Sequence, residues 1–253
     1  MKPTCDTIIR NATVIDGSGA PAAENVDIAI LADAIFRIGM KLQVNAAISI
    51  DADGLALAPG FIDAHTHDDT AVIRTPAILP KLSQGVTTVI AGNCGISAAP
   101  VTLRSTPPDP MNLLGEAQVF RYPTFASYVA ALQNARPAVN VAAFVGHTAL
   151  RSNHMERLDR TASQSEITAM QRQLQEALTA GALGLSTGLA YLSANAASTD
   201  EVLALAEPLA AARALYVTHL RSESDAIVPA MEEAFTIGRH SRAPVIVSHL
   251  KCA

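Results

Sequence analysis

The chain contains a short segment in which two histidines could bind one metal ion. Phe61–His67 begins as an apolar stretch typical of a strand, and His65 and His67 stand two residues apart within it. Side chains two apart on a strand project to the same face, with Cα atoms about 6.6 Å apart. Two imidazoles at that spacing can hold a divalent ion. The spacing alone also occurs by chance on solvated strand ends.

Three later side chains of kinds that bind zinc also follow apolar stretches. Cys94 lies in the turn Gly92–Gly95, and His219 and His249 each end a short β-rich segment. Taken singly, a cysteine is commonly a small buried apolar residue, and a strand-end histidine can simply be hydrogen-bonded. If the strands are parallel, their carboxyl ends meet at one mouth. We therefore expect a zinc centre with more ligands than one tetrahedral ion uses, formed by His65, His67, Cys94, His219 and His249.

Other polar residues stand close to these positions but fit ligand roles less well. His147 follows an apolar stretch, and we expect it to contact a ligand or a substrate rather than a metal ion. Asp68 and Asp69 come directly after the histidine pair. They are interpreted as carboxylates that support the ligands or begin a helix.

The elements that must position these residues alternate between strands and helices beyond Pro59. Short apolar strands followed by helices are typical of parallel strands that are buried on both faces. The predicted strands are Phe61–His67, Thr87–Ala91, Val139–Val145, Leu183–Ser186, Leu215–Thr218 and Val245–Ser248. The predicted helices are Ile73–Gln84, Phe125–Asn134, Ser163–Ala180, Glu201–Arg213 and Asp225–Arg239, with a capping box at Ser163 and Glu166.

The fold class that follows is α/β, a (β/α) barrel of the TIM type. About six of its eight strands are present, so the barrel is incomplete. Before it, Thr7–Ile15 ends in a turn at Asp16–Gly19, and three more short strands follow within 26–50. We predict a small antiparallel β module over residues 1–57 and the first part of the barrel over 58–253.

Composition excludes several classes of partner. A net charge of −5 and a pI near 5.8 give no basic field, so nucleic acid is not expected as a partner. No apolar run reaches the ~18 residues of a membrane helix, and the N-terminus lacks a signal-peptide core. An odd set of three cysteines indicates a reducing compartment or a thiolate with a chemical task. We expect a cytoplasmic protein that acts on a small molecule; the sequence leaves its oligomeric state open.

Several motifs together resemble the D-aminoacylase, or N-acyl-D-amino-acid deacylase, branch of the amidohydrolase superfamily. The cysteine in GNCG, where many relatives of that superfamily carry a lysine, is the feature that narrows the resemblance to this branch. The motifs are GFIDAHTHDD, GVTTVIAGNCG, GALGLSTGLAY, THLRSE and SHLKCA, with TIIRNATVIDGSGAP resembling the opening β-strands, so that the likeness covers nearly the whole chain.

The resemblance implies a zinc-dependent enzyme that hydrolyses N-acyl-D-amino acids to a carboxylate and a free D-amino acid. It implies a small β-sandwich built partly from the N-terminal strands. Cys94, His219 and His249 match a tightly held zinc, and His65 and His67 match a second, weaker metal position. Tyr191 and Lys251 match residues that contact the substrate carboxylate; a packed aromatic and a solvated charge are the alternatives.

The resemblance also implies a general-base aspartate at the end of an eighth strand, beyond Ala253. We therefore expect this chain to be a fragment that is inactive alone, with no catalytic base within it. Two other functions stay open. A cyclic-amide hydrolase related to dihydroorotase or hydantoinase would usually carry a carboxylated lysine, which Cys94 disfavours. A non-catalytic relative would have no reason to keep all five ligands.

Overall fold

The computed structural model describes residues 3–252, which belong to two compact units, Met1–Gly60 and Phe61–Ala253. Each unit has its own buried apolar clusters. Cys5, Ile8 and Ala29 form one cluster of the first unit, and Ala12, Val26 and Ile28 form another.

The first unit is a single five-stranded sheet in the order β3-β2-β1-β4, with β5 also paired to β1. The prediction of an antiparallel module is only partly right. The β1–β2 and β2–β3 pairs are antiparallel, but β4 and β5 pair with β1 in parallel. The connection after β3 returns the chain to the start of β1, where the Asn45 amide donates to the Pro3 carbonyl over 2.9 Å. The strands are β1 (Thr4–Val14), β2 (Ala23–Leu31), β3 (Ala34–Gly39), β4 (Asn45–Asp51) and β5 (Ala56–Leu57).

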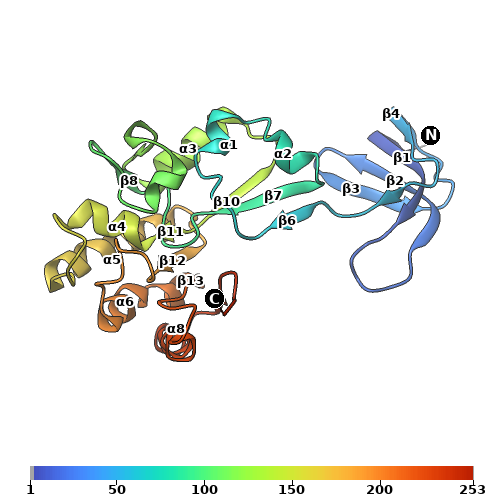
Figure 1. Cartoon of the computed structure of the whole chain (residues 1–253). Helices are drawn as coiled ribbons and strands as arrows, with labels where there is room; N and C mark the ends of the chain where they lie inside the picture. The colour runs from blue at the N-terminus through green and yellow to red at the C-terminus, as the bar shows by residue number, and fades with distance from the viewer. Residues whose placement is uncertain (1–2, 253) are drawn as a thin grey trace. The chain divides into compact units, whose positions relative to one another are not determined.

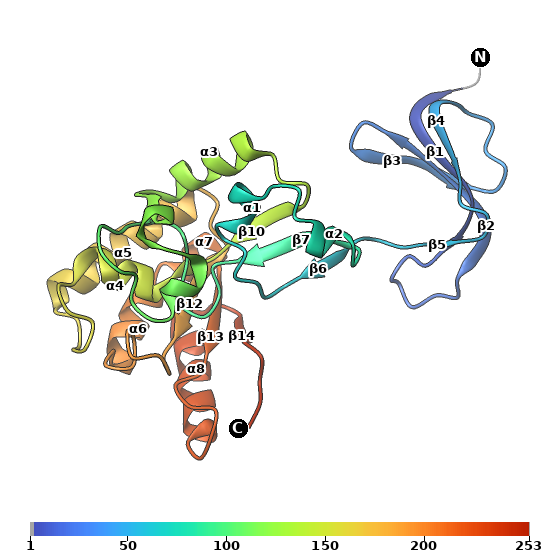
Figure 2. The ribbon, with the colours of Figure 1, turned by 45° about the horizontal axis from the view of Figure 1, so that its top comes forward.

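The second unit is built on parallel strands that follow one another in chain order. One sheet has the order β10-β7-β6 and another the order β11-β12-β13-β14, with every pair parallel (Figures 1 and 2). Phe144 alone separates β10 from β11, so the two sheets share one stretch of chain. Their strands are β6 (Phe61–Asp63), β7 (Val86–Ala91), β10 (Asn140–Ala143), β11 (Val145–Gly146), β12 (Gly184–Gly188), β13 (Leu215–His219) and β14 (Val245–Val247).

Helices cover these sheets and make the unit α/β, as predicted. In Figure 1, α1, α2 and α3 lie on one side of β6, β7 and β10. Beside β11–β14, α4 packs on α5, α5 on α6, and α6 on α8. The helices are α1 (Ala71–Arg74), α2 (Leu79–Leu82), α3 (Phe125–Ala135), α4 (His147–His154), α5 (Gln164–Thr179), α6 (Thr199–Ala206), α7 (Leu209–Ala212) and α8 (Ile227–Ser241).

A long excursion joins β7 to α3 in the second unit. It contains β8 (Val101–Thr102) paired with β9 (Arg121–Tyr122), and the short 3₁₀ helices η1 (Met111–Leu114) and η2 (Ala117–Val119). Met111 and Phe120 are buried there with Ile96, which follows the turn that carries Cys94. None of the helices within residues 3–252 combines the length and apolar character that crossing a bilayer requires.

Two predicted helices were wrong in extent because proline interrupts them. The predicted helix Ile73–Gln84 consists of α1 and α2, and Pro76 and Pro80 lie between or at the start of these short helices. Proline lacks an N–H group and disfavours helical conformation in the residue before it. Pro208 likewise separates α6 from α7 within the predicted helix Glu201–Arg213. Helix α4 was not predicted.

The predicted capping box at the start of α5 is present, and it yields the first testable prediction. The Ser163 hydroxyl accepts from the Glu166 amide, and the Glu166 carboxylate accepts from the Ser163 amide. Ser163→Ala should lower the free energy of unfolding by about 1 kcal/mol, measured by urea denaturation. Gln164→Ala, at the exposed next position, is the matched control and should change stability little. An unchanged midpoint for Ser163→Ala would contradict this account of the helix start.

Candidate metal centre

Five side chains from four strand ends meet in the second unit, and they form two overlapping groups. One group is His65, His67 and Cys94, and the other is Cys94, His219 and His249. Within each group the candidate ligand atoms all lie within 4.8 Å of one another. Cys94 belongs to both groups, so its sulfur stands between the two sets of imidazoles.

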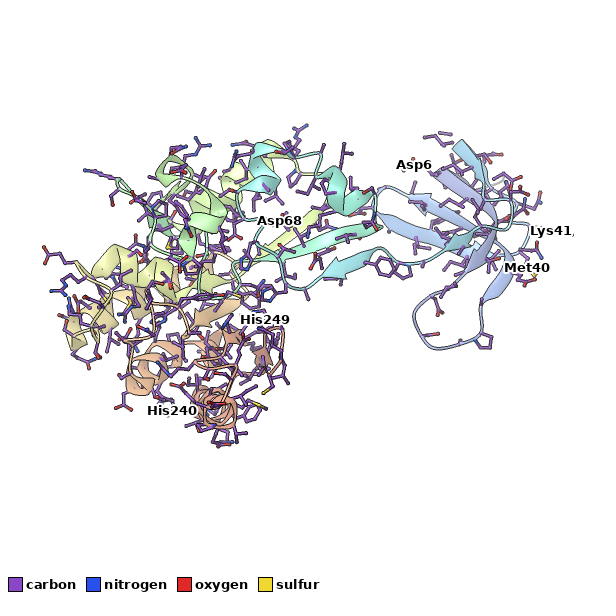
Figure 3. The ribbon with its side chains drawn as sticks, viewed as in Figure 1. Asp6, Met40, Lys41, Asp68, His240 and His249 are labelled. Atoms are coloured by element: carbon purple, nitrogen blue, oxygen red, sulfur yellow. The ribbon has the colours of Figure 1, made fainter. Side chains whose placement is uncertain are left out.

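The side chains of the cluster lie in direct contact with one another. The Cys94 Sγ lies 3.2 Å from His65 Nε2 and 3.5 Å from His249 Nε2. The ring centroids of His65 and His67 are 5.5 Å apart, and those of His219 and His249 are 4.6 Å apart. His249, labelled in Figure 3, lies beyond β14, whereas His240 on α8 belongs to neither group.

Cys94 reaches this position because the chain turns sharply after β7. Cys94 has a φ of 53°, a left-handed conformation that is uncommon for a residue with a side chain. Gly92 and Gly95 on either side also have positive φ. A Cβ on Gly92 would lie 2.2 Å from the Phe144 carbonyl oxygen, and one on Gly95 would lie 2.6 Å from the Gly188 nitrogen. The two glycines thus allow the turn to pack directly on neighbouring strand ends.

His65 and His67 come together differently from the prediction. We expected both on the strand Phe61–His67, but β6 ends at Asp63 and the histidines lie beyond it. The chain remains close to β7, because the Thr66 amide donates to the Ile90 carbonyl over 3.1 Å. Among residues 3–252, Nδ1 of His67 is one of the buried side-chain atoms that have no hydrogen-bond partner. Such an atom is normally satisfied by a partner or an ion.

Burial keeps three histidines of the cluster in the neutral form that metal ligands need, but it keeps the Cys94 thiol protonated. It lowers the pKa of His65 to about 4, with the nearby imidazoles acting in the same direction. Burial also lowers the pKa values of His67 and His219. For the Cys94 thiol, burial raises the pKa to about 11. At neutral pH His65, His67 and His219 are therefore neutral and the thiol is protonated. The thiol becomes a thiolate when a cation compensates its charge.

Tyr191 and Lys251, the predicted substrate contacts, both lie beside the cluster. The Tyr191 hydroxyl is 3.1 Å from His219 Nδ1, and burial raises the pKa of Tyr191 to about 12. The Lys251 ammonium is exposed, pairs with Glu223 and lies 3.4 Å from His249 Nδ1.

Glu223 has a role that the sequence prediction did not assign. Its Oε1 lies 3.0 Å from His249 Nδ1, and its Oε2 lies 3.5 Å from His219 Nε2. A carboxylate beside a ligand imidazole fixes its orientation and tautomer. The signal in the sequence was an acidic residue four positions after His219 in THLRSE.

The remaining candidate residues, His147 and Asp68, lie in two different parts of the unit. His147 does not contact the cluster: its imidazole is fully buried, and its Nε2 lies 3.0 Å from Glu201 Oε1 in a network with Arg151. The expected contact with a metal ligand was therefore wrong, and the expected contact with a substrate stays a prediction. Asp68, labelled in Figure 3, lies 3.1 Å from the Lys81 ammonium, and the same ammonium lies 2.7 Å from Asp63.

Comparison with known proteins identifies the family of this chain. A model of the amidohydrolase family matches residues 49–241. The chain belongs to this family. An N-acyl-D-aspartate deacylase of Alcaligenes xylosoxydans xylosoxydans is 50% identical over 98% of this chain and 50% of its own length.

Two solved structures are similar to this chain over nearly its whole length. D-aminoacylase, studied for its binuclear metal centre, matches 98% of this chain and 52% of its own chain, with a TM-score of 0.94 and 44% identity. N-acyl-D-glutamate deacylase from Bordetella bronchiseptica, in complex with zinc and a phosphonate inhibitor, matches the same shares with a TM-score of 0.92 and 41% identity. The chain spans about half the length of the relatives it matches.

The shared position of Cys94 predicts different effects for substitutions in the two groups. Cys94→Ser should abolish nearly all zinc binding by the full-length protein, because both groups lose the thiolate. His67→Asn should reduce zinc content only partly, because Cys94, His219 and His249 stay intact. Zinc per chain can be measured by elemental analysis after dialysis. His154→Asn, which alters a histidine bonded to Gln173, is the control. Equal losses of zinc in Cys94→Ser and His67→Asn would contradict the inference that both groups share the Cys94 thiolate.

Proposed function

We propose that the full-length protein is a zinc-dependent hydrolase that releases D-amino acids from N-acyl-D-amino acids. The observation that carries this proposal is the thiol of Cys94 shared by two histidine groups at the strand ends. The similar enzymes are N-acyl-D-amino-acid deacylases, and one of their structures contains zinc with a phosphonate inhibitor. The cyclic-amide alternative has no comparable support in the ligand set.

The donor set fits zinc, with one ion held by Cys94, His219 and His249 and a second, weaker position at His65 and His67. Imidazole nitrogen and thiolate sulfur are the ligands that zinc prefers. The buried, unpartnered Nδ1 of His67 is consistent with an ion at this place. When bound, zinc supplies a Lewis acid that polarises the amide carbonyl and makes water nucleophilic near neutral pH.

Residues of this chain would bind and orient the substrate. We assign Tyr191 and Lys251 to the carboxylate of the acylated amino acid, since a hydroxyl and an ammonium beside the cluster can both donate to it. Lys251 would exchange its pairing with Glu223 for the substrate carboxylate. We assign the general base, an aspartate, to the part of the protein outside this chain.

The proposed architecture places this chain within a complete amidohydrolase barrel. Residues 58–253 would supply six parallel strands of eight, and residues 1–57 would supply one sheet of a β-sandwich. An apolar groove of about 270 Å³ in the first unit, lined by residues such as Ile9, Ile35 and Ile38, supports the sandwich. Ile35 is 64% exposed, as expected for a face that a second sheet covers.

The substrate class is tested by comparing hydrolysis of three compounds by the full-length protein. N-acetyl-D-methionine should be hydrolysed with a kcat/KM at least ~100-fold above that of N-acetyl-L-methionine. A site that hydrogen-bonds a polar group of its substrate discriminates strongly against an isomer in which that group is misplaced. Dihydrouracil should not react. Release of free amino acid, measured by chromatography, gives the rates. Preferential hydrolysis of dihydrouracil would replace this proposal by a cyclic-amide hydrolase.

The pKa of Cys94 predicts how zinc affinity depends on pH. The thiol, with a pKa of about 11, is protonated at neutral pH, whereas His65, with a pKa of about 4, has already lost its proton. Zinc binding must therefore release the thiol proton. Affinity should rise about tenfold per pH unit around neutrality. Competition titrations with a chelator measure this slope, and a zinc affinity that does not change with pH would contradict the release of the thiol proton.

A further inference from the structure

One buried carboxylate lies between the two ligand-bearing segments without belonging to either ligand group. Asp69 follows His67 by two residues and is 1% exposed. It is not among the five side chains that form the candidate metal groups. An ionisable group so fully buried has to be satisfied by hydrogen bonds or neighbouring charges.

Both oxygens of Asp69 accept hydrogen bonds from the backbone on either side of Cys94. The Gly92 amide donates to Oδ2 over 3.3 Å, and the Ala98 amide donates to Oδ1 over 3.1 Å. These two amides bracket the turn that carries the cysteine. The backbone carbonyl of Asp69 in turn accepts from the Tyr128 hydroxyl on α3 over 2.7 Å. Asp69 is thus held by the helix layer while it holds the turn.

The turn needs such support because its conformation is unfavourable by itself. Gly92, Cys94 and Gly95 all have positive φ, and Cys94 carries a side chain in that conformation. Other contacts also hold the turn: at its start, the Asn93 side-chain amide donates to the Ile90 carbonyl over 2.8 Å. The Gly95 amide donates to the Ser186 hydroxyl over 3.1 Å, and the Gly95 carbonyl accepts from the Thr148 amide over 2.8 Å. Asp69 is distinct in that it bonds both the residue that begins the turn, Gly92, and a residue beyond its end, Ala98.

We propose that Asp69 is a positioning residue that keeps the Cys94 thiol within reach of His65, by fixing the turn to the segment that carries His65 and His67. The proposal rests on the metal centre proposed above. A carboxylate suits this place because both of its oxygens accept hydrogen bonds. An asparagine offers one accepting oxygen and would place an NH₂ group against one of the two amides.

The test compares Asp69→Asn with wild type in the full-length protein loaded with Co²⁺. A thiolate bound to cobalt gives a near-ultraviolet charge-transfer absorption, which reports on Cys94 and not on stability. Asp69→Asn should lower cobalt affinity by about 10-fold or more and weaken this band, as loss of a residue that orients a ligand does. In the metal-free protein, the Gly92 and Ala98 amides should exchange hydrogen faster.

Glu201→Gln is the matched control for loss of a buried carboxylate. Glu201 pairs with His147 and Arg151, away from the cluster. Its substitution should lower the melting temperature yet leave cobalt affinity and the charge-transfer band unchanged. If Asp69→Asn does not fold, Tyr128→Phe removes the hydroxyl that holds the Asp69 carbonyl. That variant should show a smaller loss of the same band.

The possible outcomes separate this inference from the proposed function. A wild-type protein that gives no thiolate band contradicts the proposed ligands, and the inference with them. A wild-type band that persists at full intensity and affinity in Asp69→Asn overturns the inference alone. For Tyr128→Phe, in the case where Asp69→Asn does not fold, an unchanged band also overturns it. An equal loss of the band in Glu201→Gln would reduce Asp69 to a general contributor to stability and likewise overturn the proposal.

Discussion

The close backbone contact between the Cys94 turn and the neighbouring strand ends is the constraint on which the site depends. Gly95 packs against Gly188, and a Cβ on Gly188 would lie 2.2 Å from the Cys94 carbonyl oxygen. A chain that approaches this closely leaves the sulfur only a small range of positions. Because β12 and β13 are in register at Gly188 and His219, the same contact places the turn beside a second ligand. Close backbone packing thus brings the candidate ligands together.

Burial of the cluster also decides where charged groups stand around it. Burial keeps the imidazoles of His65, His67 and His219 neutral, which suits metal binding but leaves little charge to hold the segments in place. Ion pairs at the edge of the cluster supply the missing electrostatic attraction. Lys81 lies between Asp63 and Asp68 on one side, and Glu223 pairs with Lys251 on the other. Away from the cluster, Glu201 on α6 pairs with His147 and Arg151 on α4, so a histidine and a carboxylate also meet in a buried structural network. Residue type alone therefore does not distinguish a site from a structural network.

Prediction from the sequence was accurate where local pattern decides structure. Apolar periodicity located the parallel strands and most helices, and the Ser163–Glu166 spacing located a helix start. It failed where several effects competed. Two prolines outweighed the apolar pattern in the predicted helix Ile73–Gln84. The parallel pairing of β4 with β1 depends on a connection that crosses back along the sheet, and local sequence carries no record of it.

The sequence by itself determined which ligand types are available and that they follow strands, because residue type and period-two alternation are local properties. It also carried the resemblance to the deacylases. Only the tertiary structure decided that Cys94 stands between both histidine groups, that His147 faces Glu201, and that Asp69 bonds the Cys94 turn. These relations join residues far apart in the chain. They depend on strand register and on a left-handed turn whose conformation only the packed strand ends maintain.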